Sequence, residues 1–84
     1  KMTSIENLFL KFLANPASLQ YFQIERLLLN LNFEKIQARG SHVKFKHADL
    51  RDQINIPIHN GDCKTIYKFK IVKIIKKNFI PILS

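Results

Sequence analysis

The spacing of apolar residues changes twice along this chain of 84 residues. Up to Asn32, apolar residues recur every three or four positions, which is the periodicity of amphipathic helices. In segments 43–47 and 53–58 they alternate with polar residues, as in strands that have one buried face. From Thr65 onward the helical spacing returns. This order places short strands between helices and predicts an α+β fold.

Two helices are expected before the first change. The first covers residues 4–14 and ends ahead of Pro16, because the residue before a proline avoids helical backbone angles. The second covers residues 21–30 and is apolar on two sides, since Phe22 and Leu29 lie opposite its main apolar face. We expect the first helix to cover this second side. A bound partner protein is the alternative.

Three strands and a helix follow. The strands are predicted at residues 33–38, 43–47 and 53–58, and Pro57 makes the last one end there or lie at a sheet edge. Segment 65–78 is predicted as a helix, because alternation fails there while one face collects apolar residues and the other lysines.

A three-stranded antiparallel sheet with helices on one face is the simplest arrangement that buries every apolar stripe. Apart from the extra N-terminal helix, the order α-β-β-β-α is that of a double-stranded-RNA-binding domain. We expect a single domain over residues 1–84, with a helical extension at 1–15 and a core at 20–78.

The chain carries 14 Lys and Arg against 6 acidic residues, a net charge of +8. Such an excess on a small domain predicts a polyanionic partner, most commonly nucleic acid, with an anionic membrane surface or an acidic protein as alternatives. Cys63 is the single cysteine, so no disulfide is expected. No apolar run approaches the roughly 20 residues of a membrane span, and no signal-peptide order is visible. We therefore expect a cytoplasmic protein without membrane contact.

The most informative motif is Gly40-Ser41-His42, which leads into an alternating strand. In an unbroken strand His42, Lys44 and Lys46 share one face, whereas His47 points to the other. A histidine moves protons near neutral pH, and cations steady the charge on a phosphate. This combination predicts metal-independent RNA cleavage with His42 as the catalytic residue. The alternative is an ordinary turn histidine.

Positions expected to contact RNA phosphates share positive charge, a hydroxyl donor or room for close approach: Arg39, Gly40, Ser41, Lys44, Lys46, Lys70, Lys73 and Lys77. The lysines of the last helix are included because no acidic residue interrupts the charges from Lys64 to Lys77, although a merely solvated face is the alternative. His47 is expected to be structural, and His59 has no assigned place. We expect no metal and no cofactor, because one cysteine and three scattered histidines form no spaced ligand pair.

Segments 28–34, 39–47 and 54–59, followed by a basic helix, resemble the HicA toxins. These are small ribonucleases of type II HicA–HicB toxin–antitoxin pairs, and the resemblance covers about residues 20–78. It implies a fold like the double-stranded-RNA-binding domain, ribosome-independent cleavage of mRNA, and His42 at the catalytic histidine position. It also implies a HicB-like antitoxin that occludes the active site. Val43 stands where many members carry a second histidine.

Two further functions stay open at this point. One is a non-catalytic RNA-binding module of the same fold. The other is an interaction domain whose basic face meets an acidic protein.

Overall fold

The computed structural model describes residues 3–37 and 40–79, without the side chain of Gln37. The elements are α1 (Ser4–Ala14), the 3₁₀ turn η1 (Pro16–Ser18), α2 (Tyr21–Asn30), β1 (Glu34–Gln37), β2 (His42–Lys46), β3 (Ile54–Pro57) and α3 (Thr65–Phe79). The predicted α+β order is confirmed. The first two helices have the expected bounds, and the other elements begin or end within one residue of their predicted limits. Ala38, the predicted end of the first strand, lies outside the described residues.

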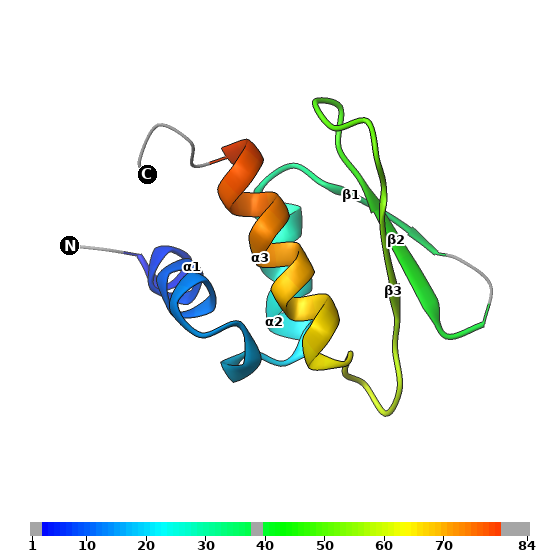
Figure 1. Cartoon of the computed structure of the whole chain (residues 1–84), viewed down its shortest axis with the longest axis horizontal. Helices are drawn as coiled ribbons and strands as arrows, with labels where there is room; N and C mark the ends of the chain where they lie inside the picture. Colours follow the sequence, from blue (N-terminus) through cyan, green and yellow to red (C-terminus); the bar gives the residue numbers. More distant parts are fainter. Residues whose placement is uncertain (1–2, 38–39, 80–84) are drawn as a thin grey trace.

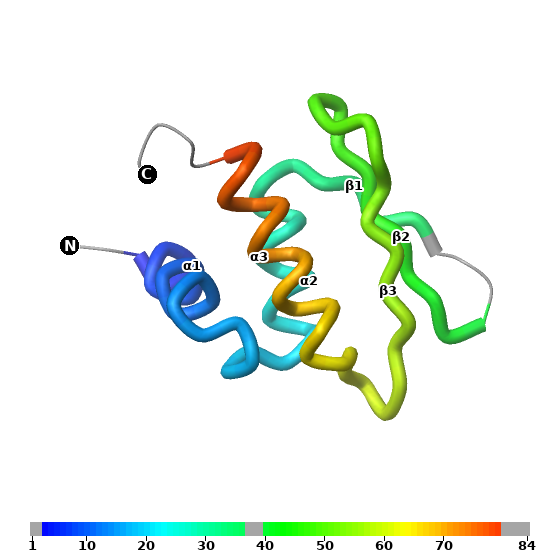
Figure 2. The backbone as a smooth tube through the Cα atoms, in the orientation of Figure 1, coloured from blue at the N-terminus to red at the C-terminus, as the bar shows by residue number. Residues whose placement is uncertain are grey.

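The elements form layers (Figure 1). The sheet lies on one side, α2 and α3 pack against one of its faces, and α1 lies beyond these two helices. The path of the backbone in Figure 2 shows the β2–β3 turn near the C-terminal end of α3 and the β3–α3 connection at the opposite end of the sheet. No described helix covers the other face of the sheet.

Capping interactions fix the start of α1 and the end of α2. The side chain of Thr3 accepts a hydrogen bond from the Glu6 backbone at 3.2 Å, and the Glu6 carboxylate accepts one from the Thr3 backbone at 2.8 Å. Helix α2 ends in a Schellman motif, in which Phe33 N–H donates to Leu28 C=O at 3.0 Å. Asn32 takes the left-handed conformation that this motif requires, with φ of 71°. The reversal directs the chain into β1.

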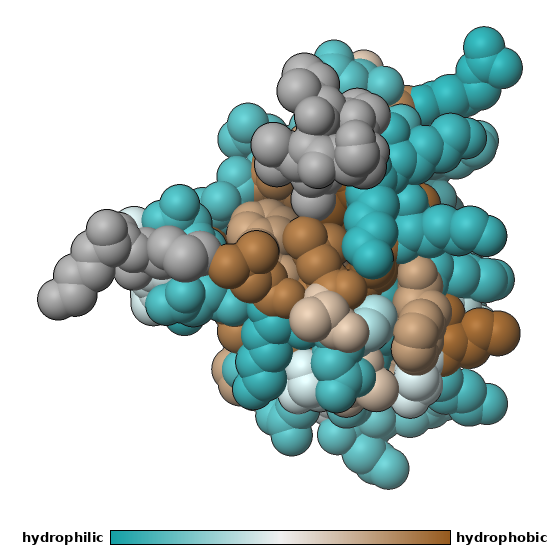
Figure 3. Space-filling view, turned by 60° about the vertical axis from the view of Figure 1, so that its left-hand side comes forward, coloured by the Kyte–Doolittle hydropathy of each residue, from teal (hydrophilic) through white to brown (hydrophobic). Residues whose placement is uncertain are grey.

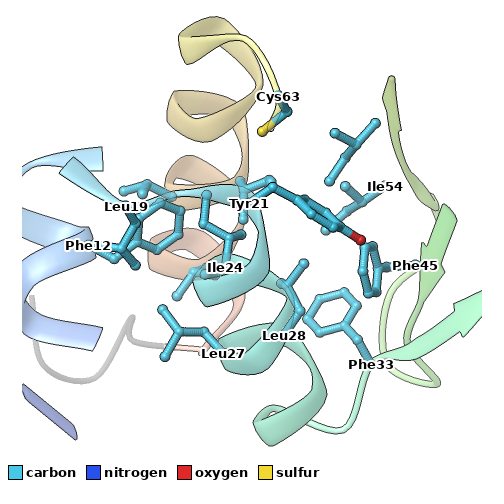
Figure 4. Close-up of a cluster of buried hydrophobic side chains, with 14 of the residues drawn as sticks. Phe12, Leu19, Tyr21, Ile24, Leu27, Leu28, Phe33, Phe45, Ile54 and Cys63 are labelled. Carbon is cyan, nitrogen blue, oxygen red and sulfur yellow. The ribbon is translucent and has the colours of Figure 1, made fainter. Parts of the chain in front are cut away.

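The expectation that α1 covers both Phe22 and Leu29 is wrong. These side chains are 62% and 46% exposed. Helix α1 contacts α2 elsewhere and inserts Phe12 beside Leu19 and Ile24, where it is fully buried (Figure 4). With the sheet, α3 and α1 already packed around it, α2 keeps one apolar strip on the surface.

The sheet has the order β1-β2-β3, and both pairings are antiparallel. Phe45 of β2 and Ile54 of β3 are paired and buried against the helices (Figure 4). Pro57 is the last residue of β3, which is an edge strand. The prediction from its missing amide is therefore confirmed.

Lysine 35 of β1 points to the helical side of the sheet. Its ammonium lies 2.8 Å from the carboxylate of Glu25 on α2, and Tyr21 donates its hydroxyl to the same carboxylate at 2.6 Å. Burial and this hydrogen bond raise the pKa of Tyr21. The charge of Lys35 is therefore paired with Glu25 between the sheet and α2. It does not lie on the face of the sheet that no described helix covers.

Candidate functional site

Histidine 42 is the first residue of the central strand β2, and its side chain is exposed. The burial of β2 alternates: Val43 and Phe45 are buried against the helices, whereas Lys44 is half-buried and Lys46 is exposed. His42, Lys44 and Lys46 therefore share the face of the sheet that no described helix covers. Successive residues of this face are separated by roughly 6.6 Å along the strand.

The two lysines of this face have different surroundings. Lys46 lies opposite Glu34 of β1, and its ammonium is 3.8 Å from that carboxylate. Lys44 lies between Ile36 and Asn55, which carry no charge. The charge of Lys44 is therefore the less compensated one, and it is also the one nearer to His42.

A turn with a left-handed residue leads into β2. Gly40 has φ of 66°, a conformation that favours glycine, and a Cβ at this position would meet no atom within 4 Å. The Ser41 carbonyl accepts a hydrogen bond from Ile58 N–H at 2.8 Å, which holds the turn to the end of β3. Space therefore stays open next to Gly40, two residues before His42. Arg39 lies outside the described residues.

The lysines of α3 lie apart from His42. Lys70, Lys73 and Lys77 are exposed, but α3 packs on the opposite face of the sheet (Figure 1). Lys70 lines a cavity of about 270 Å³ between β3 and α3, and Lys77 lines one of about 320 Å³ beside the β2–β3 turn together with Arg51. The predicted RNA contacts thus fall on two separate surfaces.

Histidine 47 points away from the open face, as its position in the strand predicts. Its Nε2 lies 2.9 Å from the Leu31 carbonyl, and its Nδ1 accepts the backbone N–H of Asp49 at 3.0 Å. The tautomer with the proton on Nε2 makes both contacts hydrogen bonds. The ring also packs edge-on against Phe33 and Phe79, with centroids 5.0 Å away in each case. These contacts tie β2 to the ends of α2 and α3 and give His47 a structural place.

A family model described as "HicA toxin of bacterial toxin-antitoxin" matches residues 23–78. The chain belongs to the HicA toxin family. The match runs from within α2 through the sheet to the end of α3, so it includes the strand that carries His42. Neither the curated proteins nor the solved structures contain a significant match.

Lysine 68 of this HicA-family chain does not belong to the basic surface of α3. Its side chain is buried, donates to the Leu19 carbonyl at 2.7 Å and lies 3.3 Å from the Asp62 carboxylate. Counting all charges from Lys64 to Lys77 as one surface is therefore wrong for Lys68. Its helical spacing from the buried Ile71 was the signal in the sequence.

The carboxylate of Asp62 joins three parts of the fold. It accepts the backbone N–H groups of Tyr21 and Cys63, each at 2.8 Å, in addition to its pairing with Lys68. Burial alone would raise the pKa of Asp62, but these hydrogen bonds and the ammonium outweigh it and leave the pKa below its ordinary value. Asp62 thereby anchors the β3–α3 connection to the start of α2.

Cys63 and the possible metal ligands bear on which other reactions the site could support. Burial raises the pKa of the Cys63 thiol, which disfavours the thiolate that a nucleophile would need. The described residues contain no group of three His, Cys, Asp or Glu side chains that could hold a metal ion.

None of the described helices is long and apolar enough to cross a membrane.

Proposed function

We propose that this HicA-family chain is an endoribonuclease that cleaves mRNA without a metal ion. The observation that supports it best is His42, which is exposed on the helix-free sheet face beside Lys44, the less compensated of the two lysines there. Membership of a toxin family supports the biological role, the toxin of a toxin–antitoxin pair.

The proposed reaction is attack of a ribose 2′-hydroxyl on the adjacent phosphorus. The O2′–P bond forms, the P–O5′ bond breaks, and the products are a 2′,3′-cyclic phosphate and a 5′-hydroxyl. His42 transfers a proton at one of the two oxygens, and Lys44 stabilises the negative charge that builds up on the phosphoryl oxygens. The Ser41 hydroxyl and the open space above Gly40 favour close approach of the phosphate.

Longer RNA has further contacts available. Lys46 lies on the same sheet face as His42 and Lys44. Arg39 lies shortly before His42 in the chain. We assign Lys70, Lys73 and Lys77 to a second phosphate-binding surface, which RNA reaches by passing the β3 edge, where Lys70 lies. Each lysine that binds a phosphate makes the affinity more sensitive to salt.

We also propose that a HicB-like antitoxin blocks the enzyme in the cytoplasm by covering His42 and the sheet face. In the described part of the chain, the large apolar side chains that stay most exposed belong instead to the helical layer: Leu10, Phe22, Leu29, Ile66 and Phe69. Figure 3 shows apolar surface framed by hydrophilic side chains on the side that carries α1. An antitoxin complex that leaves His42 open to RNA would contradict this part of the proposal.

The deciding experiment compares the purified wild type with His42→Ala on RNA in excess chelator. The wild type should cleave, and the variant should be slower by ~100-fold or more, the usual contribution of a proton-transfer group. Equal cleavage by both would exclude His42, and loss of wild-type cleavage on chelation would exclude a metal-free reaction. Lys11→Ala is a remote, exposed control that should keep full activity.

A non-catalytic RNA-binding module is the second candidate, because the same basic sheet face would serve it. It predicts that the wild type binds RNA in a salt-sensitive way and leaves it intact.

A further inference from the structure

The hydrogen-bonded ladder between β2 and β3 continues past the last paired strand residues. His42 pairs with Pro57, and the next bond joins Ile58 N–H to the Ser41 carbonyl at 2.8 Å. In this register His59 lies two residues beyond Pro57, the partner of His42, just past the end of β3.

The burial pattern of β3 and of Ile58, which follows it, indicates the face to which His59 belongs. Ile54 and Ile56 are buried, and Ile58 is partly buried against the same core. Because side chains alternate along an extended segment, His59 falls on the opposite, helix-free face. His59 is exposed, and the alternation assigns it to the face that carries His42.

A tight turn holds the backbone of His59. Its N–H donates to the Asp62 carbonyl at 2.8 Å, and Asp62 N–H donates back at 3.0 Å. Asn60 and Gly61 between them have φ of 54° and 78°, the pattern of a type I′ turn. Since the Asp62 carboxylate is itself bonded to α2 and α3, His59 sits on a rigid support.

Diagonal neighbours across an antiparallel pair are about 7–8 Å apart at their backbones. Two imidazoles at that spacing are able to flank one phosphate, with one ring at the attacking oxygen and the other at the leaving oxygen. These two oxygens lie on opposite sides of phosphorus in an in-line displacement.

We propose that His59 is the second catalytic residue of RNA cleavage and works as a pair with His42, a role that rests on the proposed ribonuclease function. One imidazole, neutral at the start, takes the proton of the 2′-hydroxyl as the O2′–P bond forms. The other, protonated at the start, gives its proton to O5′ as the P–O5′ bond breaks. The proton count balances, and no metal or further reactant takes part.

The test compares a natural RNA with the same RNA carrying sulfur in place of the bridging O5′ at the cleavage site. A thiolate leaves without being protonated, so this substrate makes a general acid unnecessary. Both His42→Ala and His59→Ala should cleave the natural RNA ~100-fold or more slowly than the wild type. One of the two variants, and only one, should recover on the sulfur substrate.

Controls separate catalysis from folding and binding. Lys11→Ala, at an exposed position of α1 away from the sheet, should cleave both RNAs like the wild type. Circular dichroism checks the fold, and His59→Asn is tested alongside because asparagine suits turns. Should His59→Ala fail to fold, His59→Asn takes its place in the comparison.

The outcomes are distinct. A wild type that cleaves neither RNA refutes the ribonuclease function and the His59 role together. Wild-type cleavage with an unimpaired His59 variant overturns only the His59 inference. So does a His59 variant that raises KM with kcat unchanged, or recovery of both or neither histidine variant on the sulfur substrate.

Discussion

Replacing Lys68 by methionine tests the buried contacts that join α3 to the start of α2. Methionine has a similar length, so it fills most of the space that the lysine stem occupies and leaves little cavity. What disappears is the charged hydrogen bond to the Leu19 carbonyl and the pairing with Asp62. The substitution therefore isolates the polar part of this cluster.

The expected loss follows from the exposure of the two partners. A hydrogen bond to a charged group contributes about 1.5–3 kcal/mol to stability. The Asp62 side chain is 40% exposed, so its pairing adds about 0–1 kcal/mol. Part of this lost free energy is recovered, because the variant has no ammonium group that must be desolvated on folding. We expect Lys68→Met to lower the free energy of unfolding by about 1–3 kcal/mol.

Urea unfolding followed by circular dichroism measures this change. With a slope of about 1 kcal/mol per molar urea for a small domain, the midpoint should fall by about 1–3 M. Lys76→Met makes the same substitution at an exposed position of α3 and should change stability by less than about 0.5 kcal/mol. If Lys68→Met behaves like this control, the buried contacts do not stabilise the fold.

Four further outcomes are expected. Lys44→Ala should weaken RNA binding more than Lys46→Ala, because Glu34 already compensates Lys46; salt titrations of binding should show the larger loss of slope for Lys44→Ala. His47→Ala should lower the melting temperature while cleavage below that temperature persists, as its ring contacts are structural. Gly40→Ala should cost about 1 kcal/mol in urea unfolding through its positive φ alone, since its Cβ meets open space. Stability should fall as the pH drops below about 4, because the pKa of Asp62 is lower in the folded than in the unfolded state. The ionised carboxylate stabilises the fold fully above the unfolded pKa, and this stabilisation is lost as the pH falls through the folded pKa. Asp62→Asn should flatten the pH dependence in unfolding curves measured at several pH values.

Local periodicity was enough to predict the elements and much of the proposed site. Three- and four-residue spacing placed the helices, and strict alternation in segment 43–47 put His42, Lys44 and Lys46 on one face. Pro57 predicted an edge because its missing amide is a local property. These features depend on neighbours in the chain, and the sequence displays them directly.

Charge counting alone was misleading for α3. Lys68 and Lys70 are close in the chain and chemically alike, yet one is buried on a carbonyl and a carboxylate while the other stays exposed. Phe22 and Leu29 show the reverse case, since apolar side chains expected under a helix are exposed. Which face of a helix is covered depends on what packs against it, and periodicity does not contain that information.

The relation of His42 to His59 belongs to the tertiary structure. The sequence predicted a structural role for His47 and gave His59 no assigned place. Strand register then placed His59 two residues beyond the partner of His42, while the ring of His47 packs against Phe33 and Phe79. Alternation along one strand determines the face of a side chain, but only pairing between strands determines which distant side chain becomes its neighbour.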